Sequence, residues 1–158
     1  KWLGENICEF FYRHYGVGCI IVRPFNVYGG PQSNDFLIPR LIEQVISESR
    51  TIIAKDYAPV RDYLYINDLI SALVEILKYE IDFGIFNVGT GVGHSVKEVG
   101  ELIQKIWGTE KKFVSLNSPR QNEISVSIAN IDKINKELGW HPAYSLEAGL
   151  RDMFKLST

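Results

Sequence analysis

The sequence contains little sulfur: two cysteines, Cys8 and Cys19, and a single methionine, Met153. The two cysteines lie on a predicted helix and a predicted strand, without a histidine or another cysteine at the spacing of metal ligands. The three histidines are scattered along the chain and form no recognisable ligand set or catalytic group. We therefore expect two buried, reduced thiols and no metal site.

An excess of either charge is also absent, because 17 basic residues stand against 19 acidic residues and give a formal net charge of -2. Binding to nucleic acid requires a concentrated basic surface, which this balance does not favour. No apolar run approaches the roughly 20 residues of a membrane-spanning helix, and the N-terminus lacks the pattern of a secretory signal. We expect a cytoplasmic protein that binds neither nucleic acid nor membranes.

Apolar residues make up 46% of the 158 residues, which is enough for the core of one domain. Segments with helical periodicity alternate with short β-branched segments, and this alternation predicts an α/β fold. The expected helices cover residues 1–15, 37–49, 67–79, 95–107, 132–138 and a last segment from 145. The expected strands cover residues 19–22, 51–54, 63–66, 85–88 and 112–116, followed by an extended segment at 124–129.

Several residues mark the ends of these helices. Ser95 and Glu98 have the spacing of a capping box, and Asn67 or Asp68 can cap the third helix. Gly139 closes the helix at 132–138. The strand at 19–22 is fully apolar and is predicted to be buried on both faces.

The helix at 1–15 is apolar around much of its circumference. Leu3, Ile7, Phe10 and Phe11 form one stripe, and a second stripe lies beside it. A helix of this kind needs cover on two sides. The cover could come from one subunit or from a second copy of the chain.

The motifs that indicate a function lie in four segments: Arg23–Gly29, Arg61–Asp68, Asn87–Gly91 and Arg120–Glu123. In this order and at this spacing they resemble the C-terminal half of the extended short-chain dehydrogenase/reductase family, the NAD-dependent nucleotide-sugar epimerases and dehydratases. The resemblance extends from Lys1 to about Leu150. The motifs are specific to the family as a set, and no single one would be.

The resemblance implies the C-terminal part of a Rossmann-type fold, with residues 1–35 from the end of the cofactor domain and the remainder in the substrate-binding lobe. It places a glycine-rich cofactor fingerprint and a catalytic tyrosine upstream of Lys1. No methionine opens the sequence. We therefore expect 1–158 to be a C-terminal portion, inactive by itself, of a protein whose N-terminal half binds NAD.

The family relationship also assigns cofactor contacts. Lys1 corresponds to the lysine that bonds the nicotinamide ribose and lowers the pKa of the neighbouring tyrosine, which makes Lys1 the candidate catalytic residue. Pro24 and Phe25 would line the nicotinamide side.

Substrate contacts are assigned to three side chains, Asn26, Arg61 and Arg120. A diphosphate favours a planar, permanently charged and bidentate partner, which an arginine provides. The carboxamide of Asn26 could bond the sugar or the diphosphate. For either arginine the alternative is an ordinary surface ion pair, for instance that of Arg61 with Asp62.

The segment Gly89–His94 follows a predicted strand and precedes a predicted helix, as a dinucleotide fingerprint does. His94 stands where the third glycine is required, so we interpret the segment as a structural turn behind the substrate pocket.

The resemblance implies a nucleotide-sugar epimerase, such as a UDP-glucose 4-epimerase-like enzyme, that transfers hydride through bound NAD and acts on a nucleotide-diphosphate sugar. A 4,6-dehydratase of the same family remains an alternative, as does a non-catalytic nucleotide-binding module. The resemblance further implies a homodimer through the helix at 1–15.

Overall fold

The computed structural model describes residues 1–80, 82–118 and 121–155. Helices and strands alternate along the chain, as the sequence predicts. The helices are α1 (Trp2–Tyr15), α2 (Leu37–Ile46), α3 (Ile66–Lys78), α4 (Val96–Trp107), α5 (Asp132–Leu138) and α6 (Leu146–Lys155). The strands are β1 (Cys19–Pro24), β2 (Asn26–Tyr28), β3 (Thr51–Ala54), β4 (Val60–Tyr65), β5 (Phe83–Val88), β6 (Gly93–Ser95), β7 (Lys112–Ser115) and β8 (Val126–Ser127).

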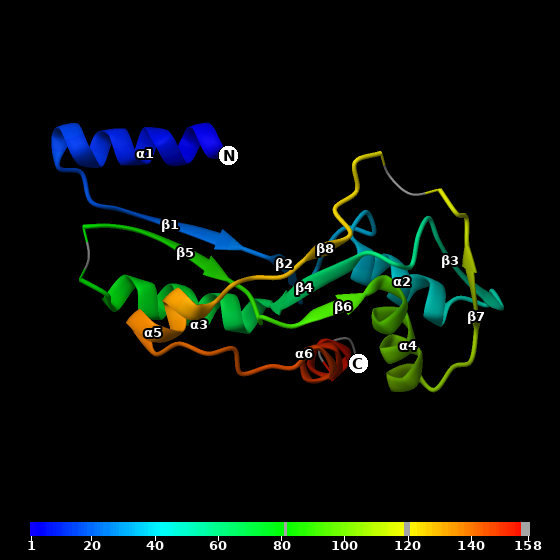
Figure 1. Cartoon of the computed structure of the whole chain (residues 1–158). Helices are drawn as coiled ribbons and strands as arrows, with labels where there is room; N and C mark the ends of the chain where they lie inside the picture. Colours follow the sequence, from blue (N-terminus) through cyan, green and yellow to red (C-terminus); the bar gives the residue numbers. More distant parts are fainter. Residues whose placement is uncertain (81, 119–120, 156–158) are drawn as a thin grey trace.

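The strands form three small sheets (Figure 1). Parallel pairing joins β1 to β5 and β3 to β7. In the third sheet, β4 pairs in parallel with β2 and β8 and antiparallel with β6. The α/β prediction is therefore confirmed.

Two clusters of buried side chains join the strands to the helices. The larger cluster lies between β4 and the helices α2, α4 and α6, and contains Tyr28, Leu41, Val99 and Leu150. The second joins β5 to α3 and α5 around Phe86. Strand β4 contributes to both clusters, because successive side chains of a strand point to opposite faces.

The predicted helix ends are mostly confirmed. Ser95 and Glu98 form the reciprocal hydrogen bonds of a capping box at the start of α4. Gly139 ends α5 in the left-handed conformation. The cap predicted at Asn67 or Asp68 is wrong, since α3 begins at Ile66 without a side-chain cap. Asp68 lies inside the helix, buried, and accepts hydrogen bonds from the backbone N–H groups at 143 and 144.

Strand β1 is only half-buried at residues 19–22, whereas its sequence predicts complete burial. It pairs with a single strand, β5, in the part of the chain that the structure describes. Cys8 and Cys19 are free thiols, and both are half-buried rather than buried.

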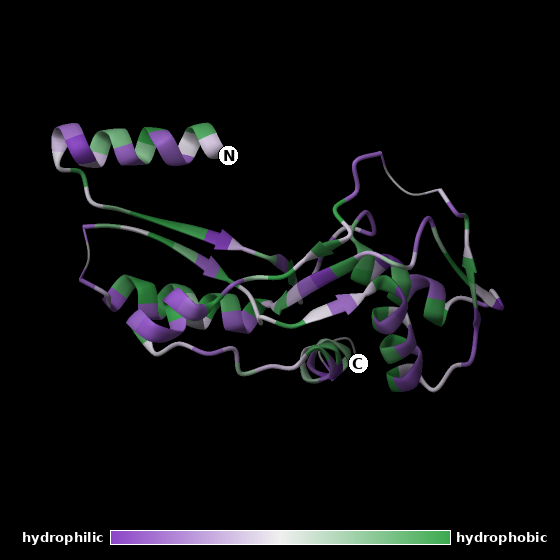
Figure 2. Cartoon of the chain, in the orientation of Figure 1, coloured by the Kyte–Doolittle hydropathy of each residue, from purple (hydrophilic) through white to green (hydrophobic). Residues whose placement is uncertain are grey.

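Helix α1 lies over β1 and presents much of its apolar surface to solvent. Leu3 is 69% exposed and Phe10 49%. Apolar and polar residues both occur along the whole of this helix (Figure 2), and its large apolar side chains at 2, 3, 7, 10, 11 and 15 are all exposed. The helix therefore lacks the polar outer face of an ordinary surface helix. Among the described residues, no helix is both long and apolar enough to cross a membrane.

Candidate substrate-binding cavity

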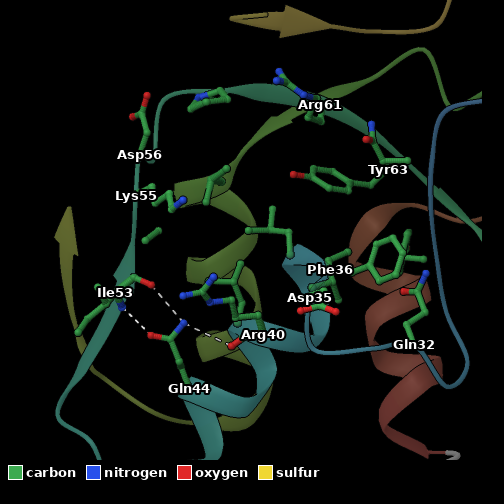
Figure 3. A pocket seen from close by; sticks show the side chains of 18 of the residues that line it. Gln32, Asp35, Phe36, Arg40, Gln44, Ile53, Lys55, Asp56, Arg61 and Tyr63 are labelled. Atoms are coloured by element: carbon green, nitrogen blue, oxygen red, sulfur yellow. Dashed lines mark hydrogen bonds between the residues drawn. The ribbon is translucent and has the colours of Figure 1, made fainter. Parts of the chain in front are cut away.

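A cavity of about 390 Å³ lies between α2 and the strands β2, β3 and β4. Asn26 and Arg61 both line it, although 35 positions separate them in the sequence. The other polar residues in its wall come mainly from the segment before α2, from α2 itself and from the segment after β3 (Figure 3): Gln32, Asp35, Arg40, Gln44, Lys55 and Asp56. Tyr63 on β4 and Glu123 also line the cavity.

The backbone that carries Arg61 is fixed by its neighbour Asp62, which is completely buried. The Asp62 carboxylate accepts hydrogen bonds from Thr90 N at 2.9 and 3.0 Å and from Thr90 Oγ1 at 2.7 Å. It also accepts from Gly91 N at 2.9 Å and from Ala129 N at 3.2 Å. The turn after β5 therefore holds a buried carboxylate.

Close packing in the same turn restricts its sequence. A Cβ atom added at Gly89 would lie 2.4 Å from the Ala129 side chain and 2.6 Å from Asp62 Oδ2. A residue larger than glycine would separate the turn from the carboxylate. Glycine at position 89 therefore lets the turn lie close enough to Asp62 to form these hydrogen bonds.

Arg61 points into a different environment from that of Asp62. Its Nη2 atom pairs with Glu123, and its Nη1 atom donates to the Val60 carbonyl oxygen at 2.8 Å. The Arg61 side chain keeps 18% of its exposure and that of Glu123 keeps 23%. The alternative of an ion pair at Arg61 is confirmed in kind, since the guanidinium pairs with Glu123. The suggested partner, Asp62, is wrong, because the strand directs these two side chains to opposite faces.

Asn26 is held against β4 by its own side chain. Its Nδ2 atom donates to the Asp62 carbonyl oxygen at 2.8 Å, and Asn26 stands opposite Tyr63 in the parallel register of β2 and β4. The side chain is consequently oriented before any ligand arrives.

Three of the predicted site residues lie outside the wall of the cavity. Pro24 ends β1, and Phe25 N donates to the Val88 carbonyl oxygen at 2.9 Å. Lys1 immediately precedes α1 and is exposed. Arg120 lies outside the described residues.

An ion pair fixes the end of α1 that carries Lys1. Glu5 pairs with Arg23, with an Nε–Oε1 distance of 2.8 Å. Because Arg23 is near the carboxyl end of β1, this contact places the start of α1 at the end of the strand that leads to Asn26 (Figure 1).

Several residues of the wall are not among those predicted from the sequence, including Arg40 and Gln44 on α2. Gln44 Oε1 accepts from Ile53 N at 2.7 Å, and Gln44 Nε2 donates to Ile53 O at 3.2 Å (Figure 3). Their spacing of four residues places Arg40 and Gln44 on one face of the helix. This spacing is the sequence signal from which the two residues could have been predicted.

Tyr63 was also missed. It is 5% exposed, and its hydroxyl is buried without a hydrogen-bond partner among the described residues. Burial raises the pKa of Tyr63 to about 12, although the nearby Arg61 opposes the shift. The hydroxyl is therefore a neutral donor at physiological pH.

Tyr63 also lines a second cavity, of about 740 Å³, between α4 and the start of α6. Two glutamates in its wall are already paired, Glu98 with Ser95 and Glu147 with Arg151. The first cavity has three cationic side chains in its wall, Arg40, Lys55 and Arg61, whereas the second has Lys105, which pairs with Glu147. Within the described segments, no group of three or more histidine, cysteine, aspartate or glutamate side chains could hold a metal ion.

Residues 1–153 match the family model described as GDP-mannose 4,6 dehydratase. The UDP-glucuronate 4-epimerase of Thermodesulfobacterium geofontis is 31% identical over 150 residues, which are 94% of this chain and 46% of that protein. The chain thus spans about half the length of this relative.

Solved structures show the same relationship. The UDP-glucose 4-epimerase of Thermotoga maritima, with UDP-glucose, superposes with a TM-score of 0.84 and 31% identity, over 99% of this chain and 52% of that one. The UDP-glucuronic acid 4-epimerase of Bacillus cereus, in complex with UDP-glucuronic acid and NAD, gives a TM-score of 0.86 and 29% identity, over 100% and 52%.

The α/β fold and the solved structures that it matches place the chain in the Rossmann-type short-chain dehydrogenase/reductase class. Within that class, the chain belongs to the extended family of NAD-dependent nucleotide-sugar epimerases and dehydratases.

Proposed function

We propose that this chain is the substrate-binding part of an NAD-dependent nucleotide-sugar epimerase, and that the cavity of about 390 Å³ receives a nucleotide-diphosphate sugar. The main observation in support of this proposal is that Asn26 and Arg61 line the same cavity. An oriented carboxamide and a guanidinium together suit a ligand that presents hydroxyl groups beside a diphosphate.

Arg61 is the proposed diphosphate ligand. Its partner Glu123 occupies Nη2, so a phosphate oxygen must replace that carboxylate or share the guanidinium with it. Both side chains retain exposure, which makes the exchange possible without unfolding of β4. We assign Arg120 to the same diphosphate from the family resemblance alone.

We propose that Lys1, Pro24 and Phe25 contact NAD, which supplies a hydride acceptor when it is bound. The Glu5–Arg23 ion pair supports this assignment, because it brings the start of α1 to the carboxyl end of β1. Open α/β sheets bind their ligands at that end. Lys1 would favour the ionised form of a nearby hydroxyl by its positive charge.

We further propose that α1 joins two copies of the chain in a homodimer of a cytoplasmic enzyme. The exposed apolar residues on α1 support this idea, because large apolar patches often mark interfaces. Sedimentation of the protein should then show a dimer that Phe10→Glu weakens.

A 4,6-dehydratase is the second candidate, and the description of the matching family model favours it. Both reactions begin with oxidation of a sugar carbon and use the same diphosphate contacts. Product analysis distinguishes them, since a dehydratase releases water and an epimerase retains the composition of the sugar.

Calorimetric titration with UDP-glucose, UDP-glucuronate and GDP-mannose tests the binding proposal. Arg61→Ala should lower the affinity at least tenfold, because a charge-assisted hydrogen bond contributes about 1.5–3 kcal/mol. Glu123→Gln should raise the affinity several-fold, because it removes the competing carboxylate. Arg151→Ala, which breaks an ion pair on α6, is the matched control and should change nothing.

Unchanged affinity in Arg61→Ala would remove the substrate role of this residue. Equal losses in Arg61→Ala and Glu123→Gln would indicate that the ion pair is structural. If the unmodified chain binds none of the three compounds, the proposal that this chain receives a nucleotide sugar in the cavity is contradicted.

A further inference from the structure

The two cysteines of the chain lie on elements that pack against each other. Cys8 is on α1 and Cys19 begins β1, and both are free and half-buried. Burial and the adjacent Cys8 thiol raise the pKa of the Cys19 thiol. Ten residues separate them in the sequence, so their proximity results from the packing of α1 on β1.

Contacts one helical turn before and one helical turn after Cys8 hold α1 against the strands. One turn before Cys8, Glu5 pairs with Arg23 at the far end of β1. One turn after it, Tyr12 stacks on Phe83 with the ring centroids 5.1 Å apart. Phe83 is the register partner of Cys19 on β5.

These contacts define one face of α1, because residues 5, 8 and 12 follow the spacing of a helical stripe. Glu5 and Tyr12 anchor the stripe to the strands, so the side chain between them faces the sheet. Two contacts that do not involve sulfur therefore hold the Cys8 side chain towards β1, the strand that Cys19 begins.

We propose that Cys8 and Cys19 form a reversible disulfide that ties α1 to β1. A low-molecular-weight disulfide such as oxidised glutathione is the oxidant. The Cys8 thiolate attacks one sulfur of glutathione disulfide and releases a glutathione thiolate. The Cys19 thiolate then attacks the Cys8 sulfur and releases the second glutathione, so two protein thiols are oxidised while one disulfide is reduced to two thiols.

The surroundings of Cys19 slow the second of these steps. Burial raises the pKa of Cys19, and the adjacent Cys8 raises it further. A thiol with a raised pKa supplies less thiolate at neutral pH, so the attack of Cys19 on the mixed disulfide is slowed. The rate of ring closure should therefore increase with pH.

Closure of the disulfide would restrain the helix that begins directly after Lys1. In the reduced protein the described contacts of α1 with β1 and β5 include one ion pair and one aromatic stack, and much of its apolar surface remains exposed. A covalent link would limit the separation of α1 from β1. The proposed disulfide involves only α1 and β1 and does not depend on the substrate proposed above.

Incubation of the folded 158-residue chain with oxidised glutathione tests the proposal. Mass spectrometry should show the loss of two hydrogen atoms, and peptide mapping without reductant should recover a Cys8–Cys19 peptide. The midpoint of thermal unfolding should rise by about 5 °C and return to its original value after reduction. Cys8→Ser and Cys19→Ser should each abolish the shift.

The remaining outcomes contradict the proposal. Protein that keeps both thiols would show that the sulfur atoms do not reach bonding geometry. A stable glutathione adduct at Cys8, or a disulfide between two chains, would show that Cys19 cannot resolve the intermediate. The thermal shift compares the oxidised and reduced forms of the same unmodified chain. A folding defect in a cysteine variant therefore does not affect that comparison.

Discussion

Asp62 and Thr90 share three hydrogen bonds, in which the backbone N–H of Thr90 donates to both oxygens of the Asp62 carboxylate and the Thr90 hydroxyl donates to one of them. This contact joins β4 to the turn after β5. The carboxylate is completely buried, so the donors around it replace the water that it loses on folding.

Replacement of Asp62 should therefore be among the most damaging substitutions in the chain. Asp62→Ala leaves the amides of Thr90, Gly91 and Ala129 without their acceptor and should lower the free energy of unfolding by about 3 kcal/mol. Urea denaturation measures the change. Asp82→Ala, at an exposed carboxylate, should stay within about 0.5 kcal/mol, and a similar small loss at Asp62 would contradict the role of the network.

Gly149 on α6 is fixed by its contact with Tyr28. A Cβ atom at position 149 would lie 2.1 Å from Tyr28 Oη, so Gly149→Ala should destabilise the chain by about 2 kcal/mol. Tyr28→Phe in the same protein should recover part of this loss, since it removes the clashing oxygen. Gly4→Ala is the control, because nothing lies within 4 Å of its Cβ position and the helix should gain about 0.5 kcal/mol.

Tyr63 and Tyr65 occupy the same face of β4 but differ in hydrogen bonding. Tyr65 Oη donates to Asp152 at 2.9 Å, whereas the Tyr63 hydroxyl is buried without a partner in the described part of the chain. Tyr63→Phe should raise the free energy of unfolding by about 1 kcal/mol, and Tyr65→Phe should lower it by a similar amount. Chemical denaturation of both variants without ligand checks the two signs.

A loss of stability in Tyr63→Phe would instead indicate that an ordered water satisfies the hydroxyl. High-resolution crystallography of the chain would then locate that water in the wall of the cavity.

The capping box of α4 should make stability depend on pH. Hydrogen bonds from Ser95 lower the pKa of Glu98 below 4.5, so the folded state favours the carboxylate. This contribution is complete above pH 4.5 and is lost as the pH falls through the lowered pKa. Glu98→Gln should therefore reduce stability at neutral pH, with a difference that decreases towards acidic pH.

Urea titrations over this pH range measure the effect. Ser95→Ala, which removes the hydroxyl that caps the helix, should cost about 1 kcal/mol at neutral pH. A constant difference between Glu98→Gln and the unmodified protein at all pH values would show that the carboxylate charge has no part in the cap.

Local sequence signals predicted elements whose ends depend on nearby residues. The strand at Thr51–Ala54 and the helix at Asp132–Leu138 have the expected bounds, and Gly139 ends that helix as expected. Strand β4 begins at Val60, before the predicted residue 63, because its first residues pair with β6 and β8. Such pairing involves residues distant in sequence, and local propensity does not contain it.

The sequence alone determined the α/β alternation, the capping box and the family, because helical periodicity, cap spacing and ordered motifs are properties of neighbouring residues. Only the tertiary structure decided that Arg61 pairs with Glu123 rather than Asp62, and that Arg40 and Tyr63 share a cavity with Asn26. The physical reason is that strand pairing and helix packing bring together side chains from distant positions, and burial then determines which of them find partners.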